Sequence, residues 1–308
     1  MTTSTASCSD SPFHDAREDL ESAESGVGRE TPQSQSPSYR LAYADSEFLL
    51  RDELRGVRLQ LELMKPELVQ RDLGVCSTVV IFGSTRIPEP AAAQAALVEA
   101  ERAAAQAPED AGLARALAVA QRVAAKARYY DEARRLGQII TEVSQTNGHS
   151  EFVVVTGGGP GIMEAANRGA QDVGGKSIGL SIVLPQEARP NPYVTPELSF
   201  QFHYFAVRKM HFLLRAKALV VFPGGYGTLD ELFETLTLIQ TKKVEPVPVL
   251  LFGRAYWQRV INFEVFAEEG TIAPADLELF QYVETAEEAW DAIQRCYGGA
   301  DEGCRRRT

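Results

Sequence analysis

The chain has 308 residues and a mass of 33.7 kDa, and 44% of its residues are hydrophobic, which suffices for a substantial core in one large or two ordinary domains. Its formal net charge of -11 and pI near 5.0 argue against broad binding to nucleic acid or to an anionic membrane. The amino terminus has no basic start or apolar stretch, and no apolar run reaches the roughly 18 residues of a membrane span, so we expect a cytoplasmic protein.

The four cysteines are far apart in the chain and none of them forms a C-x-x-C pair. They are Cys8, Cys76, Cys296 and Cys304. This spacing predicts reduced thiols in a cytoplasmic protein, with neither a disulfide framework nor a zinc site.

The amino-terminal quarter of the chain precedes the main domain. Residues 1–42 are rich in Ser, Thr, Pro and acidic groups, so we predict a disordered tail. Residues 43–75 are predicted to form a helical extension, because apolar residues between 46 and 73 recur at helical spacing, and we expect the helix to break near Pro66. This segment is expected to pack on the core or on a partner subunit.

Residues 76–299 are predicted to form one α/β domain. Short apolar runs predict strands at 78–82, 152–155, 177–183, 200–204, 218–222, 247–252 and 279–283. Helical patterns follow most of them, at 162–173, 206–217, 256–267 and 286–296, and helical apolar spacing runs from Leu229 to Ile239 after the strand at 218–222. Strands that alternate with helices and lack hairpin signals indicate a doubly wound parallel sheet, Rossmann-like, with helices on both faces.

Two further segments complete the predicted organisation. An Ala-rich helical insertion is expected over about 88–146, as one helical stretch at 90–126 followed by a helix at 129–144. Residues 300–308 are expected to form a short tail. Neither segment contains residues that suggest chemistry.

Three glycine turns follow predicted strands, at residues 83–86, 156–161 and 223–225. In doubly wound sheets, ligands bind beyond the carboxyl ends of the strands, so the three turns are expected to meet there. The third turn opens a helix, whose first N–H groups lack intrahelical partners and lie at the positive end of the helix dipole. The sequence therefore predicts an anion site.

Other cofactor and metal motifs fail at defined positions. A dinucleotide fingerprint G-x-G-x-x-G starting at Gly157 would need glycine where Ile162 stands. A triphosphate loop ending in Gly175-Lys176-Ser177 would need glycine at Ala170, and this segment follows a helix. The histidines are not spaced as a helical zinc pair, so no cofactor and no metal are expected.

The carboxylate after the third turn has two interpretations. Thr228-x-x-Glu231 before an apolar helix is a capping box, which requires no function. Arg208 and Lys209 can likewise form an ordinary solvated helix face. The functional interpretation depends on the combination of three glycine turns with a preceding Arg-Lys pair and a following carboxylate.

This combination resembles the Lonely Guy (LOG) family of phosphoribohydrolases, formerly called lysine decarboxylase-like. The family hallmark P-G-G-x-G-T-x-x-E is matched in full by residues 223–231, the Arg-Lys pair by Arg208-Lys209, and the G-G-G-x-x-G-x-M loop by residues 157–163 with a glycine one place earlier. The likeness covers roughly residues 76–298, as in a longer bacterial-type member. Asp230 stands where many members have Glu, and Glu164 stands where plant-like members have Gly.

The resemblance implies an N-glycosidase that needs no cofactor. The implied reaction hydrolyses a nucleoside 5'-monophosphate, AMP or an N6-modified AMP such as a cytokinin riboside monophosphate, to free base and ribose 5-phosphate. It also implies a homodimer or larger homo-oligomer. The alternative is a non-catalytic nucleotide or molybdenum-cofactor carrier, since those carriers resemble the same fold and hold a pterin phosphate without cleaving it.

The implied catalytic pair is Arg208 and Glu231. An ionised carboxylate beside the anomeric carbon stabilises the positive charge that develops on the sugar, and an arginine can assist the leaving base or anchor the 5'-phosphate. Contacts with the nucleotide are expected from further residues of the three turns and their neighbours: Ser84, Gly158, Gly159, Gly161, Met163, Lys209, Gly224, Gly225, Gly227 and Thr228.

Overall fold

The computed structural model describes residues 15–25, 31–145, 150–184 and 189–297. The chain divides into two compact units, residues 1–61 and residues 62–308. The predicted tail at 300–308 and parts of the predicted tail at 1–42 lie outside the described residues.

The first unit consists of short helices. It contains α1 (Ala16–Ser25), α2 (Ser46–Leu49) and the first residues of α3 (Arg55–Asp72). Within the predicted tail, α1 is a regular helix with acidic residues in its first turn, where they interact favourably with the helix dipole. None of its residues is buried, as the polar composition of this segment leads one to expect.

The second unit is an α/β domain. Its strands are β1 (Thr78–Phe82), β2 (Val153–Thr156), β3 (Ser177–Ile182), β4 (Ser199–Phe202), β5 (Ala216–Val221), β6 (Val249–Phe252) and β7 (Gln281–Val283). After the remainder of α3, its helices are α4 (Pro90–Gln106), α5 (Ala111–Lys126), α6 (Arg128–Ser144), α7 (Ile162–Asp172), α8 (Phe205–Leu214), α9 (Tyr226–Gln240), α10 (Arg254–Val260), α11 (Phe263–Glu268) and α12 (Ala286–Tyr297). The prediction of one helix at 256–267 is corrected to two, α10 and α11.

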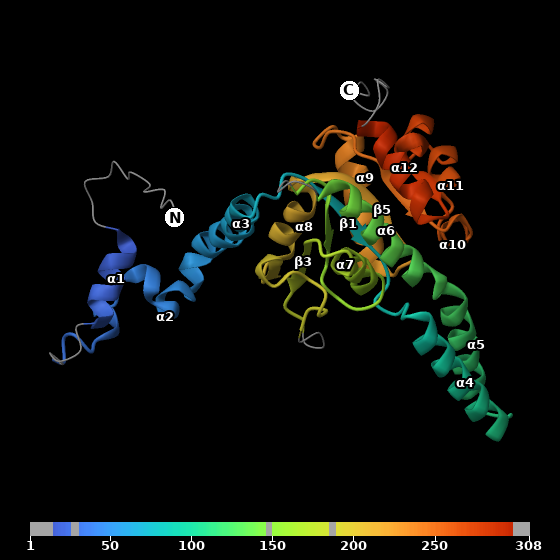
Figure 1. The fold of residues 1–308 in the computed structure, drawn as a ribbon, viewed down its shortest axis with the longest axis horizontal. Helices are drawn as coiled ribbons and strands as arrows, with labels where there is room; N and C mark the ends of the chain where they lie inside the picture. Colours follow the sequence, from blue (N-terminus) through green and yellow to red (C-terminus); the bar gives the residue numbers. More distant parts are fainter. Residues whose placement is uncertain (1–14, 26–30, 146–149, 185–188, 298–308) are drawn as a thin grey trace. The chain divides into compact units, whose positions relative to one another are not determined.

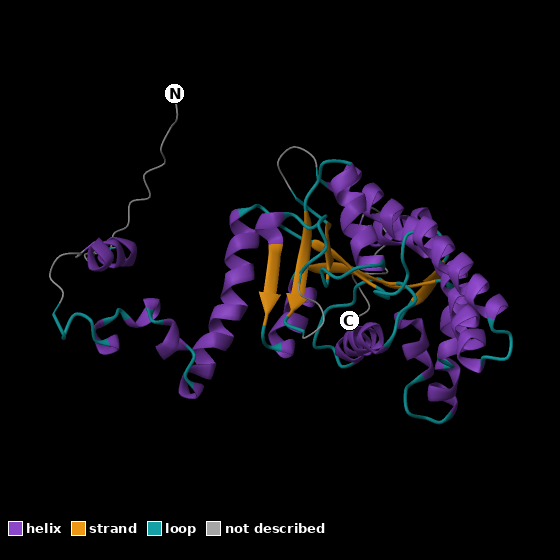
Figure 2. Ribbon diagram, turned by 90° about the horizontal axis from the view of Figure 1, so that it is seen from below, coloured by secondary structure: helices purple, strands orange, loops and turns teal. Residues whose placement is uncertain are grey.

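The strands form one seven-stranded sheet in the order β4-β3-β2-β1-β5-β6-β7, and every neighbouring pair is parallel. Figure 2 shows the strands with helices around them. The chain proceeds from β1 towards β4 on one side and from β5 towards β7 on the other. The predicted doubly wound parallel sheet is thereby confirmed. The strand order reverses between β1 and β5, and ligands bind at such a switch point in open α/β sheets.

Helices cover both faces of the sheet. A core cluster joins α6, α7 and α12 to alternate residues of the central strands, including Val79 and Ile81 of β1. Phe82 points to the other face, where its ring meets Phe212 of α8 at 4.7 Å between centroids. Right-handed crossovers place α9 on this second face too, because β5 to β6 runs in the opposite direction from β1 to β2.

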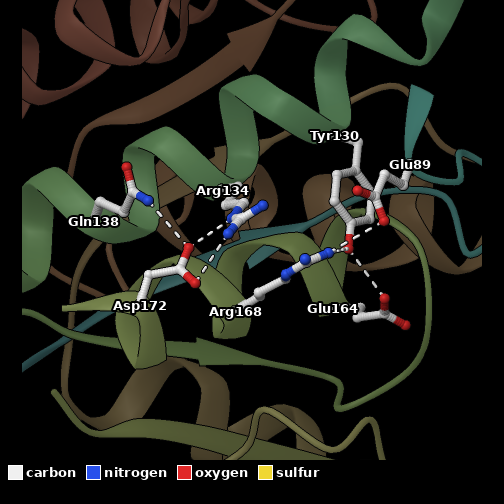
Figure 3. A network of polar contacts seen from close by, with 7 residues as sticks. All are labelled: Glu89, Tyr130, Arg134, Gln138, Glu164, Arg168 and Asp172. Carbon is white, nitrogen blue, oxygen red and sulfur yellow. Dashed lines mark hydrogen bonds and ion pairs between the residues drawn. The ribbon is translucent and has the colours of Figure 1, made fainter. Parts of the chain in front are cut away.

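Polar contacts fix α7 against α6 (Figure 3). The Tyr130 hydroxyl donates to Glu164 at 3.0 Å, and Arg168 donates to Glu89 at 3.2 Å. Arg134 forms a two-pronged ion pair with Asp172, with N–O distances of 2.5 and 3.0 Å. Two-pronged pairs hold a defined geometry, so Arg134 fixes the end of α7. The contact between Tyr130 and Glu164 holds the start of α7, which follows the second glycine turn.

Two features of the Ala-rich region differ from the prediction. Asp110 caps a new helix by accepting hydrogen bonds from the backbone N–H groups of Gly112 and Leu113, so the stretch 90–126 is the two helices α4 and α5. The pair extends away from the sheet (Figure 1). In contrast, α6 belongs to the central core and forms the crossover from β1 to β2.

The expected helix break at Pro66 is wrong. Helix α3 runs from Arg55 to Asp72 with Pro66 inside it and buried. A proline lacks an N–H and leaves the carbonyl four residues earlier, here that of Glu62, without its helical partner. Another residue supplies that partner: His211 Nε2 lies 3.1 Å from the carbonyl oxygen of Glu62.

The expectation of reduced thiols is correct at one described cysteine and wrong at another. Cys76 is a free, exposed thiol. Cys296, at the end of α12, is disulfide-bonded.

Within the described ranges, every helix is too short or too polar to span a bilayer.

Candidate functional site

The three glycine turns meet at the switch point between β1 and β5. The backbone N–H of Ser84 in the first turn donates to the carbonyl of Pro223 in the third, at 3.0 Å. The carbonyl of Ser84 accepts from the N–H of Ile162, which follows the second turn, at 3.2 Å. Gly161 has a φ of +72°, and a Cβ there would lie 2.5 Å from the Ser84 oxygen, so only glycine allows this approach.

The third turn leads directly into α9. The helix begins at Tyr226 with Gly225 as its N-cap, so Thr228 is its third residue and Glu231 lies in its second turn. A capping box requires Thr228 itself to be the N-cap, and the capping-box interpretation of Glu231 is therefore wrong. The side chain of Thr228 packs on Gly224, where a Cβ would lie 2.1 Å from the threonine oxygen.

The start of α9 is open. A Cβ added at Gly225 or Gly227 would have no heavy atom of the described chain within 4 Å. The N–H groups of a first helical turn have no intrahelical acceptors and lie at the positive end of the helix dipole. This geometry can accept an anion.

Glu231 is a buried carboxyl group with an unusual pKa. Its side chain points into the protein and only 8% of the residue is exposed. Burial raises its pKa to about 7, although the nearby charges of Arg208 and Lys209 lower it. A carboxyl group poised near neutral pH can exchange a proton during catalysis, and such perturbed groups concentrate at functional sites.

Arg208 lies at the same place and is held by three neighbours. Its Nε donates to the carbonyl of Leu180 in β3, at 2.7 Å, and its guanidinium lies 5.1 Å from the centre of the Phe212 ring. A Cβ at Gly157 would lie 2.8 Å from Arg208 Nη2 and 3.0 Å from the sulfur of Met163. Glycine at 157 therefore brings the second turn into contact with both predicted site residues.

Lys209 was expected to contact the nucleotide, but its ammonium group is paired with two carboxylates of α9. Its Nζ lies 2.8 Å from Asp230 and 2.8 Å from Glu234, one turn apart on α9. Burial alone would lower its pKa, but the hydrogen bonds to these two carboxylates and the charge of Glu231 raise it to about 12. Lys209 is thus a cation that ties α8 to α9 beside Glu231.

A buried amide network holds the second turn. The side-chain nitrogen of Asn191 donates to the carbonyls of Gly158 and Gly159 at 3.2 and 3.0 Å and also to Asn167. Asn167 in turn accepts from the hydroxyl of Thr156 at 2.7 Å. With their carbonyls engaged by Asn191, Gly158 and Gly159 are fixed at the wall of a cavity.

This cavity of about 270 Å³ lies at the carboxyl ends of β2 and β3 and beside the first residues of β4. It is lined by Gly157, Gly158 and Gly159 of the turn, by Ser181, Ile182, Arg189 and Pro190, and by Ser199, Phe200 and Gln201. Because Gly157 also contacts Arg208, the cavity is adjacent to the Arg208 guanidinium.

The structure therefore brings together most residues singled out from the sequence. Arg208 and Lys209 act electrostatically on Glu231, and Met163 meets Gly157. Gly157 and Asn191 were not expected at the site from the sequence, and neither was the role of Asp230 and Glu234 as partners of Lys209. Only Asp230 and Glu234 could have been found from the sequence, because they stand four positions apart and so lie on the same side of a helix.

These features define a Rossmann-like α/β protein with an open helix start and a buried carboxyl group near an arginine at the switch point of its sheet. The family model described as "possible lysine decarboxylase", the older name of the LOG family, matches residues 163–293. Cytokinin riboside 5'-monophosphate phosphoribohydrolase LOG3 of Arabidopsis thaliana is 28% identical over 166 residues, which cover 53% of this chain and 73% of the relative.

Cytokinin riboside 5'-monophosphate phosphoribohydrolase LOG of Oryza sativa subsp. japonica is 30% identical over 152 residues, which cover 48% of this chain and 59% of the relative. The chain thus spans under two thirds of the rice protein's length. These matches confirm that the chain resembles the LOG family, as its motifs indicate, over the segment that the family model matches. That segment contains Arg208, Glu231 and the third glycine turn.

Solved structures with a related chain path include molybdenum cofactor proteins. The molybdenum cofactor binding protein from Rippkaea orientalis is 21% identical, with a TM-score of 0.39 over 54% of this chain and 86% of the other. The molybdenum cofactor carrier protein from Chlamydomonas reinhardtii is 23% identical, with a TM-score of 0.37 over 55% of this chain and 87% of the other. At such low TM-scores the likeness carries no argument about ligands.

Proposed function

We propose that this protein hydrolyses the N-glycosidic bond of a nucleoside 5'-monophosphate, releasing the free base and ribose 5-phosphate. The observation that carries the proposal is Glu231, a buried carboxyl group with a pKa near 7 beside Arg208 and the open start of α9. Curated relatives named as phosphoribohydrolases support the reaction class.

The 5'-phosphate is assigned to the first turn of α9. Gly224, Gly225, Gly227 and Thr228 build this turn, and the N–H groups there can donate to phosphate oxygens. Ser84 borders the same point through its hydrogen bond to Pro223. A phosphate held here anchors the ribose between the third turn and Arg208.

In the proposed reaction, the bond between the base nitrogen and C1' of the ribose breaks while a water oxygen bonds to C1'. Positive charge develops on the sugar in the transition state, and ionised Glu231 stabilises it and accepts a proton from the attacking water. Arg208 supplies a fixed positive charge that favours the ionised carboxylate and the departure of the base. The water's proton returns to the base, so atoms and charge balance.

The cavity beside Arg208 is proposed to take the base. Gly158, Gly159 and Gly161 shape the adjacent turn, and Met163 lies next to Gly157 on the Arg208 side. Ser181, Ser199 and Gln201 contribute polar groups to the cavity wall. Such a wall suits the polar edge of unmodified adenine better than an N6-isoprenoid chain, so AMP is the preferred member of the proposed class.

A substrate panel tests the proposal. AMP, GMP, CMP, UMP and N6-isopentenyl-AMP are incubated with the enzyme, with adenosine as the control that lacks a phosphate, and released bases are separated by chromatography. We expect base release from AMP and at least tenfold less from adenosine, because the phosphate anchor contributes binding energy to the reaction. Absence of base release from every monophosphate would refute the function.

Two glycines of the third turn are expected to respond in opposite ways to alanine. Gly224→Ala places a Cβ against Thr228, so we expect a loss of about 1–3 kcal/mol and a lower melting temperature. Gly227→Ala adds a Cβ in open space within a helix, so stability is kept or gains up to about 1 kcal/mol. If phosphate binds at this turn, Gly227→Ala raises KM for AMP about tenfold; an unchanged KM would remove the phosphate from this position.

The proposed assembly is a homodimer or larger homo-oligomer. Exposed apolar side chains on α8 and α9 support it, namely Phe205, Met210, Leu214 and Tyr226. The carrier alternative remains open as a prediction, and it requires protein that retains a fluorescent pterin through purification and releases no base.

A further inference from the structure

From Glu62 onward, α3 lies against α8, the helix that provides Arg208. The carboxylate of Glu62 accepts two backbone hydrogen bonds, from the N–H of His203 at 2.8 Å and from that of Tyr204 at 3.1 Å. Tyr204 is the N-cap of α8, and no side-chain hydrogen bond of its own caps the helix. A carboxylate at this end of a helix satisfies free donors and complements the dipole.

The same residue contacts α8 a second time through its backbone. Pro66 cannot donate to the carbonyl of Glu62, and His211 Nε2 lies 3.1 Å from that oxygen. A carbonyl only accepts, so this ring nitrogen holds the proton. His211 has a side chain with 0% exposure, and burial lowers its pKa, which keeps the ring neutral at pH 7.

These contacts lead directly to Arg208. The backbone N–H of Arg208 donates to the carbonyl of Tyr204 at 3.2 Å, so the residue held by Glu62 is also the hydrogen-bond partner of Arg208. His211 lies three positions after Arg208, and Arg215 lies seven positions after Arg208. Arg215 is paired with Glu67 of α3. Positions three, four and seven apart lie on one side of a helix, so α3 supports the side of α8 that includes Arg208.

We propose that Glu62 is a positioning residue for Arg208, and that the end of the helical extension acts as a brace for the catalytic helix. The catalytic consequence rests on the proposed function. The brace lies far outside the matched family segment 163–293, and it gives the extension a role in the reaction instead of a role only in stability.

A double-mutant cycle tests the brace through activity. Glu62→Gln preserves the size of the side chain but presents an amide to one of the two N–H donors; Lys65→Gln, on the exposed side of α3, is the matched control. We expect Glu62→Gln to lower kcat tenfold or more with KM unchanged, because the phosphate is assigned to α9, and Lys65→Gln to have no effect. In an Arg208→Ala background, Glu62→Gln should lower kcat no further.

A second measurement does not depend on activity. Amide hydrogen exchange is followed at residues 203–208 in wild type, Glu62→Gln and Lys65→Gln. We expect exchange at least tenfold faster in Glu62→Gln alone. Equal exchange in all three proteins overturns the brace even if no substrate is found, and multiplicative losses of kcat in the double mutant overturn its action through Arg208. A wild type that releases no base refutes the proposed function and leaves the exchange result to decide the brace.

Discussion

Glu231→Gln is expected to lower kcat by about 10²–10⁴-fold, the range typical of a general acid–base group. The substitution removes the negative charge and the titratable proton but retains nearly the same volume. Because Glu231 does not cap α9, its replacement leaves the helix start unchanged. Loss of activity therefore reports on chemistry at the carboxyl group.

The same variant is expected to gain stability at alkaline pH. The carboxyl group titrates near 4.5 in the unfolded chain and near 7 in the folded protein, so the folded state binds the proton more tightly. Stability from this group is present below pH 4.5 and is lost as pH rises to about 7, a loss of roughly 3 kcal/mol. Glutamine does not titrate, so Glu231→Gln should avoid this loss.

Thermal denaturation at pH 5 and pH 8 measures the effect. We expect Glu231→Gln to melt roughly 5–10 °C above wild type at pH 8 and to differ much less at pH 5. A variant that gains stability while losing activity is characteristic of a buried functional group. Lower stability at pH 8 together with full turnover would contradict both the burial and the catalytic assignment.

Arg208→Ala is expected to lower kcat by about 10²–10³-fold, the cost of removing one preorganised electrostatic group. The variant also removes a positive charge that lowers the pKa of Glu231, so that pKa should rise above 7. If the ionised carboxylate is the active form, kcat/KM of wild type falls below about pH 7 with decreasing pH. In the variant this acidic limb should move to higher pH.

The measurement is a pH–rate profile of kcat/KM for wild type, Arg208→Ala and Arg208→Lys. Lysine retains the charge but cannot reproduce the planar contacts with Leu180 and Phe212, so it should restore the position of the limb more than the rate. An unchanged limb in Arg208→Ala would mean that Arg208 does not act on Glu231.

The sheet could be predicted because it is buried on both faces. Strands such as Thr78–Phe82 are continuous apolar runs, and helical periodicity separates them, so parallel order follows from local pattern. The site could be located for a related reason. Glycine turns at strand ends meet wherever a doubly wound sheet brings the carboxyl ends together.

The remaining features depend on contacts between distant parts of the chain. The sequence places Thr228 where a capping box would begin, but packing on Gly224 and the hydrogen bonds of the first turn start α9 at Tyr226. Pro66 appears as a helix breaker, yet His211 from a distant helix satisfies the freed carbonyl. The partners of Lys209 and the contact of Gly157 with Arg208 likewise exist only after folding.

The central claim is that Glu231 and Arg208 cleave the glycosidic bond of a nucleoside monophosphate. The most direct test quantifies free adenine and ribose 5-phosphate together after incubation of AMP with wild type and with Glu231→Gln. We predict equimolar amounts of the two products from wild type and at least about 100-fold less from the variant. Equal product from both proteins, or adenine without ribose 5-phosphate, would contradict it.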